Sequence, residues 1–273
     1  MSESVTFAMG DGAVLAGERR SGAGPTVVLL HAGVADRRAW RAVADEPALA
    51  GLDLVAYDRR GFGETPATGV PDHLGDLRSV VEHLADGPAW LVGNSQGGRI
   101  ALDLAVSEPA LVAGLVLIAP AVSGAPDPDE DALDADTRRI DADIEAADAA
   151  GDLEAVNRHE VRLWLDGPSG PEGRVGGAAR ELALEMNAIT LAADWDADPP
   201  PELPTWNRLG EIQIPATVAC GELDLPFFVA QCRVLAERLP RAESAVTLPG
   251  VAHLPGLEAP GMVAALIAAA VRG

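Results

Sequence analysis

Eight short stretches in which hydrophobic residues alternate with polar ones or run together predict the strands of a sheet. The first two, residues 5–9 and 13–18, alternate and are joined by Gly10-Asp11-Gly12, whose residues tolerate positive φ and favour a hairpin. Most of the others are continuous apolar runs, which is typical of strands buried on both faces of a parallel sheet. These later stretches cover residues 25–31, 52–57, 89–93, 114–119, 215–220 and, as a shorter strand, 244–248.

Segments with helical spacing lie between these stretches. They cover residues 37–46, 73–85, 96–106, 226–239 and 261–271. Strand and helix alternate along the chain, which predicts an α/β fold with a doubly wound, mostly parallel, eight-stranded sheet.

The strand rhythm stops between residues 123 and 209, where the sequence becomes acidic and helical. Apolar side chains in this segment, such as Leu163 and Leu165, must be buried, and a lid packed over the carboxyl edge of the sheet would bury them. We therefore expect a core of residues 1–122 and 210–273 with a helical cap at 123–209. The acidic residues have two interpretations: solvated faces of cap helices, or a surface that repels anionic substrates.

Charge and composition narrow the classes of partner. The net charge is −22, and all 20 basic residues are arginines because the chain has no lysine. Nucleic acid and anionic membranes are therefore poor partners, and chemistry that needs a lysine amine is excluded. Two cysteines give no disulfide framework, and no spacing suggests a metal site. We expect a small-molecule substrate, no cofactor and no metal.

Targeting signals are also absent from the pattern. The first residues carry no basic segment, and no apolar run approaches the roughly 18 residues of a membrane span. We expect a soluble, cytoplasmic protein with no membrane partner, either a monomer or a homodimer.

The segment Gly93-Asn94-Ser95-Gln96-Gly97 matches the motif G-x-S-x-G. A predicted strand leads into it and a predicted helix leads out, and small flanking residues let the strand and helix approach. This arrangement exposes the Ser95 hydroxyl at the carboxyl edge of the sheet as a candidate nucleophile. The alternative is an ordinary serine that caps the following helix.

A serine nucleophile needs a base and an acid that orients the base. His253 lies in a loop between the last strand and the last helix, and Asp224 directly follows the strand at 215–220, so both reach the same sheet edge. The order Ser95, Asp224, His253 is that of one class of catalytic triad. Glu222 is the alternative acid, and Asp58 is expected to structure a turn. Structural or solvent-facing roles are expected for the other histidines, His31, His73, His83 and His159.

Two backbone N–H groups are candidates for an oxyanion hole. Gln96 follows the serine at a helix N-terminus, and Gly33 lies in the turn after the strand at 25–31, with Val34 as the alternative donor. A simple turn at residues 31–34 is the other interpretation. Substrate-pocket candidates are Val34, Trp164, Met186, Trp195 and Trp206, although aromatic and methionine residues at helical spacing more often belong to the core.

These motifs together resemble the α/β-hydrolase superfamily, essentially from end to end of the chain. They are His31-Ala32-Gly33, Asp58-Arg59-Arg60-Gly61-Phe62-Gly63-Glu64-Thr65, the segment around Ser95, and Gly250-Val251-Ala252-His253-Leu254-Pro255-Gly256-Leu257-Glu258. The last one is similar to the 3-oxoadipate enol-lactonase-like branch. Ala32, where many relatives have glycine, and the acidic cap depart from the family pattern.

The resemblance implies a serine hydrolase that acts on a small to medium carboxylic ester or lactone. A serine at this position disfavours the haloalkane dehalogenase and epoxide hydrolase branches, which use an aspartate there. Three alternatives remain open: a cofactor-free haloperoxidase or perhydrolase, a carbon–carbon bond hydrolase with the same triad, and a catalytically silent ligand-binding homologue.

Overall fold

The computed structural model describes residues 2–84, 87–126, 133–194 and 197–273, which fold around an eight-stranded sheet. The strands are β1 (Glu3–Ala8), β2 (Val14–Arg20), β3 (Thr26–Leu30), β4 (Asp53–Tyr57), β5 (Ala89–Asn94), β6 (Val112–Ile118), β7 (Ala216–Gly221) and β8 (Val246–Leu248). Their order is β1-β2-β4-β3-β5-β6-β7-β8. Only the pairs β1–β2 and β2–β4 are antiparallel among these strands. The predicted fold class is confirmed.

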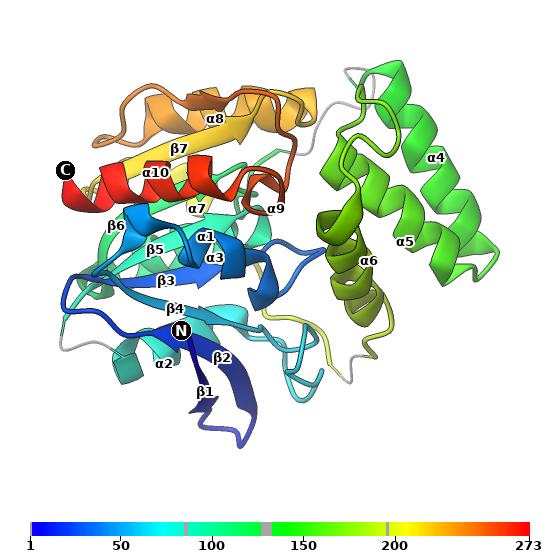
Figure 1. The fold of residues 1–273 in the computed structure, drawn as a ribbon. Coiled ribbons are helices and arrows are strands. Elements are labelled where there is room, and N and C mark those ends of the chain that lie inside the picture. The colour runs from blue at the N-terminus through cyan, green and yellow to red at the C-terminus, as the bar shows by residue number, and fades with distance from the viewer. Residues whose placement is uncertain (1, 85–86, 127–132, 195–196) are drawn as a thin grey trace.

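Helices cover both faces of the sheet (Figure 1). One face packs against α2 (His73–Leu84), α3 (Gln96–Ser107) and α8 (Pro226–Arg238), and the other against α1 (Arg41–Ala44) and α10 (Pro260–Arg272). In β3, for example, Val28 and Leu30 join the first cluster while Val27 and Leu29 join the second. This two-sided burial is the physical reason for the continuous apolar runs in the sequence.

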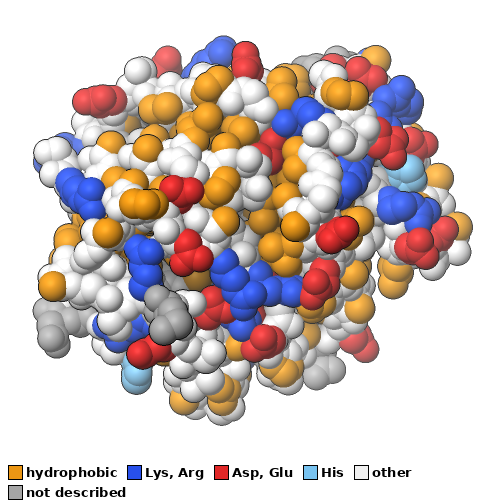
Figure 2. All heavy atoms as spheres, in the orientation of Figure 1, with side chains coloured by type: hydrophobic (Ala, Val, Ile, Leu, Met, Phe, Trp, Pro, Cys, Tyr) orange, Lys and Arg blue, Asp and Glu red, His pale blue; other side chains and the backbone are white. Residues whose placement is uncertain are grey.

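A group of helices lies beyond the end of the sheet toward which the parallel strands run (Figure 1). It consists of α4 (Ala135–Ala149), α5 (Leu153–Val161), a π-helical turn η5 (Arg162–Asp166) and α6 (Gly177–Leu191). Leu165 and Met186 of this cap pack against Ala32 and Leu254 of the sheet domain. No strand occurs in the described part of residues 123–209. Acidic and basic side chains are interspersed over the outside of the cap (Figure 2).

The predicted helix at residues 37–46 is wrong in detail, because the chain there forms a 3₁₀ turn η1 (Arg37–Trp40) and then the short α1. Pro47 lacks an N–H and disfavours helical geometry in the residue before it. The Arg20 guanidinium also donates hydrogen bonds to the Ala44 and Leu49 carbonyl oxygens. The remaining short helices are η2 (Pro47–Leu49), η3 (Pro109–Leu111), α7 (Thr205–Arg208), η6 (Leu209–Glu211) and α9 (Pro255–Glu258). Among the described helices, none has the length and hydrophobicity needed to cross a membrane.

Candidate active site

Ser95 lies in the tight turn between β5 and α3, with a backbone φ of 54° and ψ of −117°. A positive φ is costly for a residue with a side chain, about 1–3 kcal/mol, and is typical of functional sites. The surrounding backbone holds it: the Ser95 N–H donates to the Ile118 carbonyl at 2.9 Å, and the Ala121 N–H donates to the Ser95 carbonyl at 3.1 Å. Although Ser95 is the residue before α3, its side chain makes no capping hydrogen bond. The structure therefore does not support the helix-cap interpretation.

The glycines on either side allow β5 and α3 to approach each other. A Cβ on Gly93 would lie 2.4 Å from the Gly98 backbone nitrogen, and one on Gly97 would lie 2.3 Å from the Leu30 carbonyl oxygen. Both contacts are with backbone atoms, which have no rotamer through which to move away. The turn therefore requires glycine at both positions.

Asp224 and His253 form a buried pair. The Nδ1 atom of His253 lies 2.9 Å from Oδ2 and 3.0 Å from Oδ1 of Asp224. The Leu225 N–H donates to Asp224 Oδ1 at 2.8 Å and fixes the carboxylate at the start of α8. Glu222 instead accepts a hydrogen bond from the Gly250 N–H at 2.8 Å and stabilises the turn that follows β8. Asp224, and not Glu222, is the partner of the imidazole.

Asn94 connects the His253 loop to the Ser95 turn. Its Nδ2 donates to the His253 carbonyl and to the Ile118 carbonyl, both at 3.1 Å. The residue immediately before Ser95 is thus bonded to the backbone of His253, across 159 positions of sequence. Sequence reasoning missed this role, because Asn94 stands at an unspecified position of the G-x-S-x-G motif.

The His253 ring is packed between aromatic side chains of the cap and of α8. The ring centroids of Trp164 and Phe228 each lie 4.6 Å from that of His253. The His253 N–H also donates to the Trp164 carbonyl at 3.2 Å, so the π-helical turn of the cap is bonded directly to the histidine loop. Phe228 was not among the sequence candidates. The imidazole therefore sits in apolar surroundings that one cap residue helps to form.

The two predicted oxyanion segments are in contact. A Cβ on Gly33 would lie 2.7 Å from the Gln96 Nε2 atom, so the Gln96 side chain packs directly on the turn after β3. His31 is buried, and its Nε2 accepts a hydrogen bond from the Arg59 N–H at 3.1 Å, which is the structural role expected for it. Gly33 and Gln96 thus lie on neighbouring segments beside Ser95.

The remaining pocket candidates are dispersed. Met186 is fully buried between cap and sheet domain, where its sulfur accepts a hydrogen bond from the Asp36 N–H at 3.4 Å. Val34 is partly buried at the edge of the same cluster. Trp206 packs against Arg238 instead of His253: the Arg238 Cζ atom lies 4.4 Å from the centroid of the Trp206 ring. Trp195 lies outside the described residues.

Asp58 structures the turn after β4, as predicted. It accepts hydrogen bonds from the N–H groups of Arg37, at 2.9 Å, and Glu64, at 2.8 Å, and it pairs with the Arg37 guanidinium. Burial raises the pKa of Asp58 to about 6. Among the other histidines, burial lowers the pKa of His73, whereas His83 is exposed and packs edge-on to Phe7. His159 is half-buried on α5.

Comparison with known proteins decides the family. A model of the alpha/beta hydrolase fold matches residues 25–260. The chain belongs to this family.

Its relatives agree with the assignment. The chain is 31% identical over 155 residues to Lipase LipV of Mycobacterium tuberculosis, covering 55% of each protein. It is 30% identical over 193 residues to the 2-(acetamidomethylene)succinate hydrolase of Mesorhizobium japonicum, covering 64% of this chain and 66% of that one. The matches thus span about half to two thirds of these relatives' own length. A thermophilic esterase from Thermogutta terrifontis superposes with a TM-score of 0.73 at 23% identity, covering 100% of this chain and 98% of the other, and shares the α/β-hydrolase fold.

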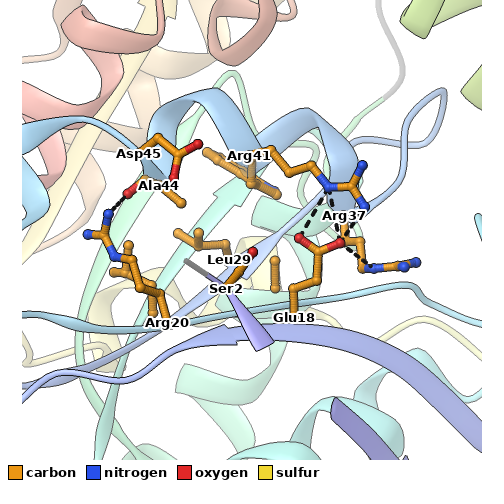
Figure 3. A pocket seen from close by; sticks show the side chains of 11 residues that line it. Ser2, Glu18, Arg20, Leu29, Arg37, Arg41, Ala44 and Asp45 are labelled. Carbon is orange, nitrogen blue, oxygen red and sulfur yellow. Dashed lines mark hydrogen bonds and ion pairs between the residues drawn. The ribbon is translucent and has the colours of Figure 1, made fainter. Parts of the chain in front are cut away.

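A hollow of about 100 Å³ between β2 and the η1–α1 segment is separate from these residues (Figure 3). Its arginines already have partners: Arg41 and Arg37 bind Glu18, and Arg20 binds the Ala44 carbonyl. The hollow therefore adds no residue to the site. In the described part of the chain, no cluster of three or more His, Cys, Asp or Glu side chains is arranged to hold a metal ion.

Proposed function

We propose that this protein is a serine hydrolase that cleaves a small to medium carboxylic ester or lactone through an acyl-enzyme on Ser95. One observation carries the proposal: a serine in the left-handed region, at a strand-to-helix turn, adjoins a buried Asp224–His253 pair through Asn94. Nucleophilic catalysis by serine uses a histidine base that an acid orients, and backbone strain at the serine is typical of functional sites. Relatives and structural neighbours named lipase and esterase support ester hydrolysis.

In the first step, Ser95 Oγ attacks the substrate carbonyl carbon while its proton passes to Nε2 of His253. Nε2 is the available ring nitrogen, because Nδ1 faces Asp224. The carbonyl π electrons move to the oxygen, and the N–H groups of Gly33 and Gln96 donate to the oxyanion that forms. Gln96 is the first residue of α3, whose N-terminal dipole favours negative charge. Each donor of this kind stabilises the transition state by about 2.7–4 kcal/mol.

Collapse of the tetrahedral intermediate breaks the ester carbon–oxygen bond. The leaving oxygen takes the proton from His253, and the acyl group stays on Ser95. Water then attacks the acyl carbon and gives a proton to His253, which returns it to Ser95 Oγ as the carboxylic acid leaves. Asp224 accepts from the Nδ1 side of the ring and holds the imidazole in one tautomer throughout. A lactone follows the same steps, with the leaving hydroxyl still attached to the product.

A neutral substrate is favoured over an anionic one. Trp164 and Phe228 surround the imidazole with apolar surface. The net charge of −22 repels anions at long range. Perhydrolysis and carbon–carbon bond hydrolysis use the same triad, so the substrate panel should include esters, lactones and a peroxide-dependent bromination substrate.

The test compares wild type with Ser95→Ala on p-nitrophenyl acetate and butyrate. We expect the variant to lose turnover by about a thousandfold or more, because removing a triad nucleophile leaves only binding and the oxyanion donors. A fluorophosphonate probe should label wild type and not the variant. Ser107→Ala is the control, because the Ser107 hydroxyl only donates to the Asp103 carbonyl at the end of α3. Comparable turnover by Ser95→Ala would rule out the proposed mechanism.

A further inference from the structure

Arg59 is a fully buried arginine with no acidic partner among the described residues. No carboxylate oxygen of a described residue lies within 4.0 Å of its guanidinium. Its neighbour Arg60, also buried, is paired twice with Asp76 at 2.8 Å and also with Asp11. Burying a cation without a counter-ion is costly, and burial lowers the pKa of Arg59 to about 9. Such a cost is typical of a site that serves function.

The donors of Arg59 reach two segments that are far apart in sequence. Its Nη1 donates to the Gln96 side-chain oxygen at 3.0 Å, and its Nη2 donates to the Ala32 carbonyl at 3.0 Å. The guanidinium carbon Cζ also lies over the Phe62 ring, 4.2 Å from its centroid. One rigid group therefore joins the turn after β3 to the first residue of α3.

These two segments carry the proposed oxyanion donors. Gly33 directly follows Ala32, whose carbonyl Arg59 binds, and the Gln96 side chain held by Arg59 packs against Gly33. The spacing between the Gly33 and Gln96 N–H groups thus depends on the same three contacts. A lysine ammonium lacks the planar fork needed to bind both acceptors at once.

We propose that Arg59 is a positioning residue that holds the two N–H groups of the oxyanion hole at their working distance. This inference rests on the proposed function, because the hole is needed only if Ser95 forms a tetrahedral intermediate. It concerns a residue that lies outside the triad and outside both donors.

The test measures kcat and KM for p-nitrophenyl butyrate in Arg59→Met and Arg59→Lys, with Arg60→Met as the matched control. We expect kcat to fall about 10- to 100-fold in Arg59→Met with KM changed less than about threefold, since displacing a donor costs less than the 10²- to 10³-fold of removing one. Arg59→Lys should recover little of the loss. Arg60→Met should lower Tm by leaving Asp76 unpaired, while kcat per folded molecule stays within about threefold of wild type.

Binding of a trifluoromethyl ketone separates positioning from general loosening. Its adduct with Ser95 places an alkoxide in the hole, so its inhibition constant should rise by about the same factor as kcat/KM falls. Gln96→Leu should give a similar loss, and the double variant with Arg59→Met should lose less than the product of the two factors.

Two outcomes would overturn the inference: wild-type kcat in both Arg59 variants, or a kcat loss in Arg60→Met equal to that in Arg59→Met. If Arg59→Met fails to fold, the same criteria apply to Arg59→Lys. Failure of the proposed function looks different, because Ser95→Ala would then keep its turnover. The inference alone fails when Ser95→Ala is inactive and Arg59→Met and Arg59→Lys are fully active.

Discussion

Two carboxylates lie two positions apart after β7, and their hydrogen bonds assign them different roles. Asp224 accepts from Leu225 N–H at the start of α8 and faces His253, whereas Glu222 accepts from Gly250 N–H in the turn after β8. Each carboxylate is therefore fixed by a backbone donor, and only one is aimed at the imidazole. Both side chains are carboxylates, so the local geometry decides which of them orients the imidazole.

Replacing Asp224 by asparagine tests this assignment. We expect Asp224→Asn to lower kcat by up to about 10⁴-fold, because the amide favours the wrong tautomer of His253. The thermal transition should move little, since the side chains have the same shape. The measurement is steady-state ester hydrolysis together with Tm. Glu222→Gln is the matched control and should retain kcat within about threefold; a loss as large as that of Asp224→Asn would transfer the orienting role to Glu222.

Some residues of the site follow from the sequence, and others depend on contacts that the sequence does not display. Ser95, Asp224 and His253 follow predicted strands of one parallel sheet, so the topology places all three positions at the same edge. Asn94, Phe228 and Arg59 act through partners far along the chain, such as the His253 carbonyl and the Gln96 side chain. No local pattern marks such residues, because their surroundings exist only after folding.

At the scale of elements, the approach of β5 to α3 sets the shape of the site. The Gly93→Ala variant tests it, because the added Cβ would lie 2.4 Å from the Gly98 nitrogen and 2.5 Å from the Gly97 carbonyl. We expect the free energy of unfolding to fall by about 1–3 kcal/mol or more, because neither backbone atom has room to yield. Ester turnover should fall as well, since the Ser95 turn must shift.

Chemical denaturation and the p-nitrophenyl butyrate assay provide the two readouts for Gly93→Ala. Gly210→Ala is the control, since a Cβ there has no atom within 4 Å and the residue lies in η6. Wild-type stability and turnover in Gly93→Ala would show that β5 and α3 can move apart enough to accommodate the added Cβ at no cost.

The elements themselves were predicted unevenly. The first two strands follow from alternation and the others from apolar runs, which strands buried on both faces require. The structure reproduces the strand positions to within about two residues. The π-helical turn at Arg162–Asp166 was not predicted, since one added residue per turn hardly changes the helical spacing of apolar side chains. Yet this turn brings Trp164 to His253. This irregular element thus brings the cap into contact with the candidate site.

At the scale of the whole molecule, Asp103 on α3 fastens both ends of the cap segment. The Ser123 hydroxyl donates to its Oδ2 at 2.8 Å, and the Thr205 hydroxyl donates to its Oδ1 at 2.5 Å. Ser123 lies where the chain leaves β6 for the cap, and Thr205 begins α7 where it returns. One carboxyl group therefore ties the departure and the return of the cap to the helix that follows Ser95.

This anchor predicts a dependence of stability on pH. Burial raises the pKa of Asp103, although the Thr205 and Ser123 hydroxyls oppose that shift. Between its ordinary pKa and the raised one, the folded protein binds a proton that the unfolded chain releases. The contribution of Asp103 to stability is therefore fully present below the ordinary pKa and is lost as pH rises through the folded pKa.

The Asp103→Asn variant isolates this contribution, because an amide keeps the shape of the side chain and does not titrate. We expect the Tm of the variant, relative to wild type, to rise as pH increases from about 4 to about 7. Thermal unfolding at three pH values across that range measures the difference. Asp143→Asn, which removes an exposed charge on α4, is the control for the loss of one negative charge. A difference for Asp103→Asn that follows that of the control, or that moves in favour of wild type, would mean that the buried carboxyl is ionised at no cost. The two hydroxyls would then stabilise its charge fully, and the cap would be fastened equally well at every pH in the range.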